Sequence, residues 1–199
     1  MERKLILASN SPRRQELLRG LGLDFEIDTR NSFVEVVEPG TPARDVPMLM
    51  SVGKSHGFHR PLEPGEVLIT SDTSVIAAVD DAGCGDGHLV ALGKPRDRED
   101  AIAMLHLLSG RTHEVMTAVT LRSAVSERSF TDSTSVTFLP LEESEIVRYV
   151  DGFRPYDKAG AYAIQEWIGF IGISAINGSY FNVMGFPVHR VWQELKSFR

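Results

Sequence analysis

Two adjacent arginines, Arg13 and Arg14, occupy the position where the sequence predicts the first turn of a helix. An apolar run over residues 5–8 leads into the polar residues 9–11 and then Pro12, which suits a first turn because that turn leaves its amide unpaired anyway. First turns favour acidic residues, since their exposed amides carry partial positive charge. Hydroxyls, free amides and two guanidinium groups together predict a site for a polyanion such as a phosphate chain, whereas ordinary paired arginines are solvated surface charges.

Asp72 comes directly after residues 67–70, a continuous apolar run with β-branched residues. Such a run predicts a strand covered on both faces, and we expect Ser71, Asp72 and Thr73 at its end, with strand structure resuming over residues 75–79. A carboxylate in that position needs a partner, and the C-terminal ends of strands in α/β sheets are where ligands and metals are held. The alternative interpretation is that Asp72 caps a turn or a helix.

Three further charged residues stand near the predicted ends of elements. Glu35 lies in an alternating run over residues 33–38 that predicts a strand, and Lys54 lies in the C-terminal half of a helix predicted over residues 45–58. Lys94 closely follows another predicted strand. Hydrolysis of a phosphoanhydride needs cations spread over the phosphate oxygens, and carboxylates that hold Mg²⁺ or Mn²⁺ and orient or deprotonate the attacking water. The sequence supplies both kinds of group.

Several common catalytic motifs are missing from the chain. No G-x-x-x-x-G-K-[ST] loop is present, which excludes a P-loop NTPase, and no G-x-S-x-G elbow is present, which argues against a serine hydrolase. The histidines show neither an H-x-x-x-H nor an H-E-x-x-H arrangement, so we assign none of them to catalysis.

Composition limits the class of protein further. The chain has 199 residues, of which 42% are hydrophobic, enough for one large domain or two small ones with a sizeable core. The formal net charge is −6 and no block of basic residues stands out, so we expect no nucleic acid partner. Cys84 is the only cysteine, which excludes intrachain disulfides and indicates a reducing compartment. No apolar run approaches the ~18 residues of a membrane span, so we expect a cytoplasmic protein with no membrane partner.

The remaining pattern predicts strands and helices around these residues. Strands are expected over residues 25–27, 89–92, 113–121 and 128–138, the last two as an antiparallel hairpin, and helices over residues 12–21, 97–108 and 142–150, with a final helix opening at Pro187. Gly22 is expected to end the first helix, and Leu49 and Trp192 are expected to face inward. Residues 80–87 superficially resemble a calcium loop but lack its bidentate glutamate, so they predict a flexible turn.

Six segments in order resemble the blocks of the Maf family, septum-formation-associated proteins that act as nucleoside triphosphate pyrophosphatases. The first is SNSPRRQELL, close to the family signature S-x-S-P-R-R-x-E-L-L, and the others are SDTSVIA, GKP, LSGRTHEVMTAV, DKAGAYAIQ and NGSYFNVMGFPV. They cover nearly the whole chain, and several independent blocks in the same order make the match specific.

The resemblance implies an α/β fold of the inosine-triphosphatase-like kind, with an elongated, mixed, twisted sheet flanked by helices. It implies a single domain over residues 1–199, in which two lobes surround a nucleotide cleft, and commonly a homodimer. The implied activity is hydrolysis of a nucleoside triphosphate to the monophosphate and pyrophosphate with a divalent metal, Mg²⁺ or Mn²⁺. The competing interpretation is a catalytically weak, nucleotide-binding regulator of septum formation or cell division.

The resemblance also assigns roles to matching positions of this sequence. Contacts with the substrate are implied for Ser9, Arg13, Arg14, Lys54, Lys94 and Gln165. Asp72 matches the proposed general base or metal-linked water activator, and Glu35 matches the metal-associated glutamate, with Glu38 as the alternative.

Gln165, within AYAIQ, resembles the branch of the family that prefers dTTP and UTP. A glutamine amide offers one donor and one acceptor to the O4/N3 edge of thymine or uracil, so this role is chemically reasonable. Three features depart from the family pattern: Asn10 replaces a usual glycine or alanine, the segment between Asp72 and Lys94 is longer than usual, and Glu166-Trp167 replaces a small residue after the glutamine. These departures concern the shape of the cleft mouth and the base preference rather than the phosphate chemistry.

Overall fold

A computed structural model describes residues 3–79 and 88–198 of the chain. Within these residues it contains a seven-stranded sheet of order β2-β1-β3-β5-β6-β7, with β4 paired to β3 outside this path. The strands are β1 (Lys4–Leu7), β2 (Phe25–Ile27), β3 (Glu66–Val79), β4 (His88–Leu92), β5 (Thr112–Arg122), β6 (Glu127–Phe138) and β7 (Ile173–Asn177). The helices are α1 (Pro12–Arg19), α2 (Val46–His56), α3 (Arg98–Leu108), α4 (Glu143–Phe153), α5 (Trp167–Gly172), α6 (Tyr180–Val183) and α7 (Val188–Ser197), with 3₁₀ turns η1 (Ala43–Asp45) and η2 (Ala159–Ala161).

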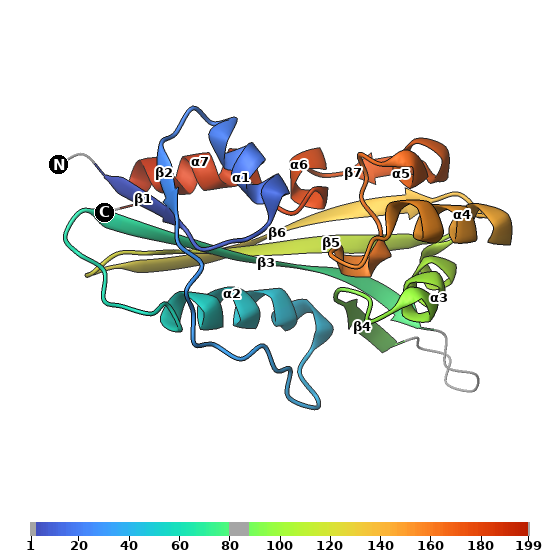
Figure 1. Cartoon of the computed structure of the whole chain (residues 1–199), viewed down its shortest axis with the longest axis horizontal. Coiled ribbons are helices and arrows are strands. Elements are labelled where there is room, and N and C mark those ends of the chain that lie inside the picture. Colours follow the sequence, from blue (N-terminus) through green and yellow to red (C-terminus); the bar gives the residue numbers. More distant parts are fainter. Residues whose placement is uncertain (1–2, 80–87, 199) are drawn as a thin grey trace.

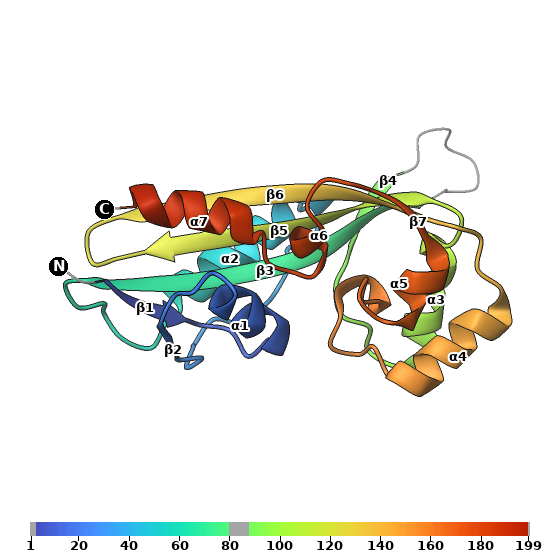
Figure 2. The same ribbon diagram turned by 90° about the horizontal axis from the view of Figure 1, so that it is seen from above.

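The sheet is mixed and elongated. Strand β1 runs parallel to β2 and β3, whereas the β3-β5, β5-β6, β6-β7 and β3-β4 pairs are antiparallel. Figures 1 and 2 show α1 and α7 on one face of the sheet and α2 on the other, near the end where both termini lie, and α3, α4 and α5 grouped around the opposite end. The expected architecture, an elongated mixed sheet flanked by helices, is confirmed.

Each face of the sheet has its own apolar packing. On one face, Leu18 of α1 and Val191 of α7 belong to a buried cluster with Ile69 and Val119 of the sheet. At the far end, buried residues of α3, α4 and α5 pack with β3, β5 and β6 around Phe138. The amphipathic helices therefore form because each buries one apolar stripe against the sheet, which is where most helical stability in proteins arises.

The pairing of β3 changes along its length. Strand β1 stops at Leu7, opposite Ile69, and β4 starts pairing only at Val75, so residues 70–74 are paired on one side alone, with β5. Side chains alternate there: Thr70 and Asp72 meet α2, and Thr73 meets α1. The prediction that Asp72 follows the end of a strand is therefore wrong, because Asp72 lies in the middle of β3, which is 14 residues long.

Residues 33–38, predicted as a strand, form a loop without strand pairing. Phe33 is seated against the glycines of α2, where a Cβ on Gly53 would come within 2.3 Å of its ring. Val34 and Val36 point to solvent, with 73% and 60% exposure. An alternating pattern indicates an extended chain with two unlike faces, but it does not create the neighbouring strand that a sheet requires.

Other expectations need correction at element boundaries and faces. Helix α1 ends at Arg19, so Gly22, with φ of +70°, lies in the following turn. Helix α4 continues to Phe153, beyond its predicted end at residue 150. Leu49 is 50% exposed and Trp192 is 37% exposed, because one-residue offsets place their buried neighbours on the inner faces of α2 and α7. The turn predicted over residues 80–87 lies outside the described residues.

The difference in burial between Leu18 of α1 and Leu49 of α2 generates a stability prediction. Leu18→Ala removes a fully buried side chain and should lower the free energy of unfolding by about 2–5 kcal/mol. The same change at half-exposed Leu49 should lower it by less than about 1 kcal/mol. Urea unfolding followed by circular dichroism measures both. Equal losses at the two positions would contradict the assigned packing.

Candidate active site

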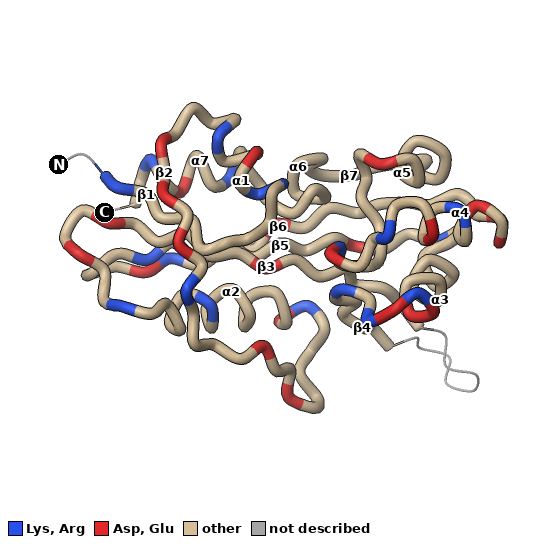
Figure 3. Tube along the Cα trace, in the orientation of Figure 1, with Lys and Arg blue, Asp and Glu red and all other residues tan. Residues whose placement is uncertain are grey.

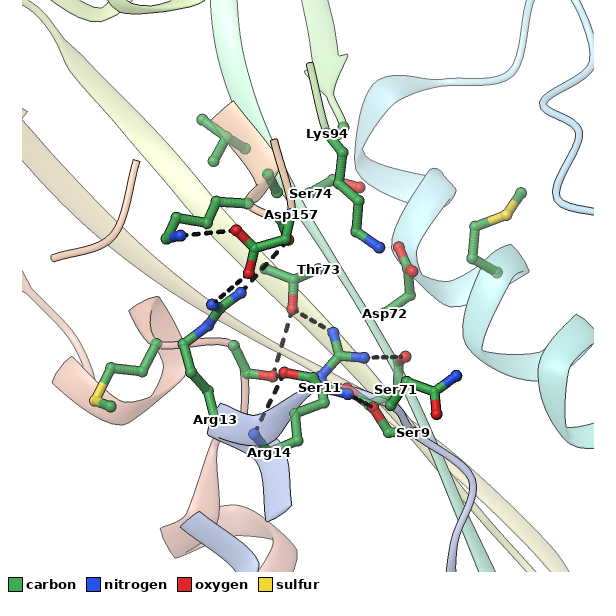
Figure 4. Close-up of a pocket in the computed structure, with 18 of the residues that line it drawn as sticks. Ser9, Ser11, Arg13, Arg14, Ser71, Asp72, Thr73, Ser74, Lys94 and Asp157 are labelled. Carbon is green, nitrogen blue, oxygen red and sulfur yellow. Dashed lines mark hydrogen bonds and ion pairs between the residues drawn. The ribbon is translucent and has the colours of Figure 1, made fainter. Parts of the chain in front are cut away.

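A cleft of about 720 Å³ lies beside the segment of β3 that is paired on one side only. Its lining comes from the start of α1, the loop over residues 29–37, α2, residues 71–75 of β3, the segment after β4, and residues 157–165. These segments are far apart in sequence and meet only around the middle of β3. Figure 4 shows side chains from several of them converging.

The start of α1 forms one wall of the cleft. Ser11 caps the helix by accepting the backbone N–H of Arg14 at 3.4 Å, and its own N–H donates to the Ser9 hydroxyl at 3.2 Å. Pro12 stands in the first turn, which contains no acidic residue. Ser9 is buried, so its hydroxyl belongs to the turn that fixes the helix N-terminus. The predicted arrangement of hydroxyls and arginines at a helix start is confirmed.

Arg14 links α1 to the unpaired edge of β3. Its guanidinium donates to the Ser71 carbonyl at 2.8 Å, the Thr73 hydroxyl at 3.0 Å and the Gly185 carbonyl at 3.0 Å (Figure 4). Burial lowers the pKa of Arg14, while the charge of Asp72 raises it. An arginine nevertheless stays protonated at neutral pH. Arg14 therefore supplies a fixed positive charge and replaces, for one carbonyl, the strand partner that β3 lacks.

Arg13 faces the opposite wall of the cleft. It donates to the Asp157 carboxylate at 2.9 Å, and Asp157 is also bound by Lys158 at 2.7 Å. Burial raises the pKa of Asp157, but hydrogen bonds from Lys158 and Arg13 outweigh this and bring it to about 2. The carboxylate is therefore ionised at neutral pH. Neither Asp157 nor Lys158 was singled out from the sequence, although both lie in the segment DKAGAYAIQ, where adjacent opposite charges precede a run of small residues.

Lys54 of α2 lies between two carboxylates. Its Nζ is 2.6 Å from Asp72 Oδ1 and 3.0 Å from Glu35 Oε1, and both Lys54 and Asp72 have less than a fifth of their side chains exposed. Glu38 is exposed and lies outside the lining of the cleft, so the structure brings Glu35 rather than Glu38 to this point. Two carboxylates thus converge within hydrogen-bonding distance of a single nitrogen atom.

Lys94 and Gln165 complete the predicted set. Figure 4 shows the Lys94 side chain, on the segment after β4, directed toward Asp72. Gln165 lines the cleft, and its Oε1 is a buried acceptor with no hydrogen-bond partner in the described part of the chain. A buried acceptor of this kind is costly unless a ligand or water satisfies it. All the site residues predicted from the sequence, apart from the alternative Glu38, lie in one cleft.

Figure 3 shows that charged residues are distributed along the whole chain trace rather than gathered in one basic face.

Among residues 3–79 and 88–198, every helix is too short or too polar to cross a membrane. No group of three or more histidine, cysteine or acidic side chains that could enclose a metal occurs in that described part.

A mixed sheet whose middle strand exposes an edge to arginines, lysines and carboxylates defines an α/β protein built to hold a polyanion. The chain belongs to the Maf-like protein family, whose pattern it matches over residues 4–198.

Two relatives of similar sequence agree with this membership. A dTTP/UTP pyrophosphatase of Phocaeicola vulgatus is 46% identical over 193 residues, covering 97% of this chain and 95% of that protein. A dTTP/UTP pyrophosphatase of Porphyromonas gingivalis is 44% identical over 197 residues, covering 98% and 94%. A HAM1 protein from Coxiella burnetii, whose structure is solved, superposes over 98% of this chain and 99% of its own with 16% identity and a TM-score of 0.49.

A buried histidine that contacts the cleft residue Tyr162 generates a pH prediction. His113 Nε2 lies 2.7 Å from the hydroxyl of Tyr162, a cleft residue, and burial lowers the pKa of His113 from 6.5 to about 4. Between pH 6.5 and pH 4, His113 is protonated in the unfolded chain but stays neutral in the folded chain. The unfolded state is therefore favoured progressively as the pH falls from 6.5 toward 4, and the full stability of the fold is present only above pH 6.5. The expected loss is about 3 kcal/mol.

Chemical denaturation between pH 4 and pH 7.5 measures this contribution. His113→Gln should remove it, so the free energy of unfolding of the variant should depend less on pH than that of the wild type. Parallel curves for the two proteins would contradict the assignment of a neutral, buried His113.

Proposed function

We propose that this chain is a nucleoside triphosphate pyrophosphatase that hydrolyses dTTP and UTP to the monophosphate and pyrophosphate. The observation that carries the proposal is the meeting of five cations, three carboxylates and an unsatisfied glutamine amide in one cleft. Relatives at 44–46% identity over nearly their whole length are named dTTP/UTP pyrophosphatases, which supports the same substrate class.

The cationic residues would receive the triphosphate. Arg13 and Lys94 have side chains at the surface of the cleft, and the free amides at the start of α1 add partial positive charge. Arg13 is paired with Asp157 and Lys54 with Asp72, so a phosphate chain would exchange these partners for its own oxygens. Arg14 already has three acceptors, and its main contribution is a fixed field and a fixed helix position.

A divalent cation fits the donor set in this cleft. Glu35 and Asp72 offer hard carboxylate oxygens around one point, which suits Mg²⁺ or Mn²⁺ held by one or two carboxylates together with substrate phosphates and water. Such an ion, when bound, offsets charge on the phosphate oxygens and increases the acidity of coordinated water. Binding it requires Lys54 to release the two carboxylates, after which the ammonium group is available to the phosphate chain.

Asp72 is proposed to orient and deprotonate the attacking water. The oxygen of that water forms a bond to the α-phosphorus, its proton passes to the Asp72 carboxylate, and the bond from the α-phosphorus to the bridging oxygen breaks. Pyrophosphate leaves with the bonding electrons, and the nucleoside monophosphate remains. The position of Asp72 in the middle of β3 holds the carboxylate on a rigid strand, which favours reproducible geometry for this step.

Gln165 is proposed to recognise the base. Its amide has a donor and an acceptor for the O4/N3 edge of thymine or uracil, and the buried Oε1 would gain a donor from the N3–H. With the amide in the same orientation, cytosine would place its acceptor N3 against Oε1 and its N4 amino group against Nε2, so neither hydrogen bond could form. Purines present a different edge and a larger ring system.

Assembly and location are also proposed. A homodimer is supported by the exposed apolar side chains of Ile176, Tyr180 and Phe181 near the edge strand β7, and by Phe170, which is 78% exposed. A cytoplasmic location is supported by the single cysteine of the chain.

Pyrophosphate release from dTTP, UTP, CTP, GTP and 7-methylguanosine triphosphate, with Mg²⁺ or Mn²⁺ and with chelator, tests the function. We expect release from dTTP and UTP that requires the metal.

Asp72→Asn should reduce turnover at least ~100-fold with nearly unchanged nucleotide affinity, because an amide cannot accept the proton. Asp151→Asn, which removes an exposed carboxylate on α4, is the matched control and should stay active. Nucleotide binding without release from any substrate would favour the regulator instead.

Gln165→Ala tests the recognition of the base. The preference for dTTP and UTP over CTP should fall about tenfold, whereas turnover of the best substrate should fall less, because the amide contacts the base and not the reacting phosphate. Steady-state kinetics on the three nucleotides measures both quantities. An unchanged order of substrates would remove Gln165 from base recognition.

A further inference from the structure

One hydroxyl group holds both ends of the turn that contains Gln165. Tyr149 is fully buried in α4, and its Oη accepts the backbone N–H of Ala163 at 3.2 Å while donating to the carboxylate of Glu166. Burial, and then the hydrogen bond to Glu166, raise the pKa of Tyr149, so the hydroxyl stays protonated. The turn over residues 163–166 is therefore fixed at its first and last residues by the same atom.

The side chain of Glu166 binds Tyr149 instead of capping helix α5. Glu166 occupies the N-cap of α5, yet it makes no side-chain capping hydrogen bond there. Its carboxylate instead accepts from Tyr149 and lies 3.3 Å from the ammonium of Lys158, whose side chain is only 8% exposed. Lys158 also binds Asp157, the partner of Arg13. The turn is thus connected by ion pairs to the phosphate end of the cleft.

Backbone packing restrains the same turn from the side of α5. A Cβ on Gly169 would lie 1.9 Å from the Ile164 carbonyl oxygen, so the first turn of α5 packs directly against the backbone before Gln165. Side-chain contacts and backbone packing together leave the Cα of Gln165 little freedom. Ala163 and Ile164 are also buried in the core, so the backbone that leads into Gln165 is held on that side as well.

Resting on the proposed function, we infer that Tyr149 is a positioning residue for base selectivity, acting through Gln165, with Glu166 and Lys158 holding its hydroxyl in place. Gln165 Oε1 is buried and unsatisfied, so it favours a base that brings a donor to that atom. Discrimination between the N3–H of thymine and the bare N3 of cytosine requires the amide within ~0.5 Å of its proper place. A turn released at both ends would let the amide adapt to either base.

Tyr149→Phe tests this inference because it removes the hydroxyl while keeping the buried ring and its stacking on Phe153. We measure KM for dTTP and the inhibition constant of dCTP. The inhibition constant divided by KM is the selectivity ratio, which is high when the site prefers thymine. The ratio should fall about fivefold to tenfold, the effect of one hydrogen bond, mostly through a higher KM and with kcat nearly unchanged. Tyr180→Phe, which removes a hydroxyl from a half-exposed ring on α6, is the matched control and should keep the wild-type ratio.

The same substitution in a Gln165→Ala background separates positioning from a general loss of structure. If Tyr149 acts through Gln165, Tyr149→Phe should change the selectivity ratio less than about twofold once the amide is gone. An unchanged ratio in the single variant, or equal losses in both backgrounds, would overturn the inference. Glu166→Gln, which weakens the grip on Lys158 but keeps the volume, should lower the ratio in the same direction and serves if Tyr149→Phe folds poorly.

Failure of this inference is distinguishable from failure of the proposed function. A wild-type protein that releases no pyrophosphate from any nucleotide would contradict the function itself. A wild-type protein that hydrolyses dTTP, combined with a Tyr149→Phe variant of unaltered selectivity, would contradict the positioning role alone.

Discussion

The rest of the structure depends on the early end of β1. Because β1 stops opposite Ile69 while β3 continues, residues 70–74 have a free edge in the middle of the molecule. An unpaired strand edge must satisfy its backbone groups in another way. Here the guanidinium of Arg14 binds the Ser71 carbonyl and the Thr73 hydroxyl, which fixes the start of α1 against the strand. The cleft therefore exists because β3 lacks a strand partner over residues 70–74. Arg14, which binds this unpaired edge, also contributes positive charge to the cleft.

Charge neutralisation is the second constraint. The cations of the cleft are held close to carboxylates from other parts of the chain, as in the contacts of Arg13 with Asp157 and of Lys54 with Asp72 and Glu35. These pairs join α1, α2 and β3 to segments distant in sequence, so they contribute to the arrangement of the walls. A buried charge without a partner would be costly. The oxygens of an incoming polyanion would take the place of these carboxylates as partners of the cations.

Sequence patterns predicted the long elements well. The β5–β6 hairpin and helices α2 and α3 were located within one or two residues, because their apolar periodicity, caps and turns all indicate the same structure. The errors share one physical origin. The alternating run over residues 33–38 and the inward positions of Leu49 and Trp192 depend on which surface a segment meets, and periodicity does not contain that information. The choice between Glu35 and Glu38 was open for the same reason.

The sequence by itself determined the kinds of group available: a helix start with two arginines and no acidic residue, an aspartate shortly after an apolar run, and lysines near helix or strand ends. Local chemistry suffices for these features because caps, propensities and charges act over a few residues. Only the tertiary structure decided that Asp72 lies within a continuous strand, that Glu35 rather than Glu38 reaches Lys54, and that the Tyr149 hydroxyl holds the turn around Gln165. Those contacts join residues far apart in the chain, so they follow from how elements pack and not from the composition of any one segment.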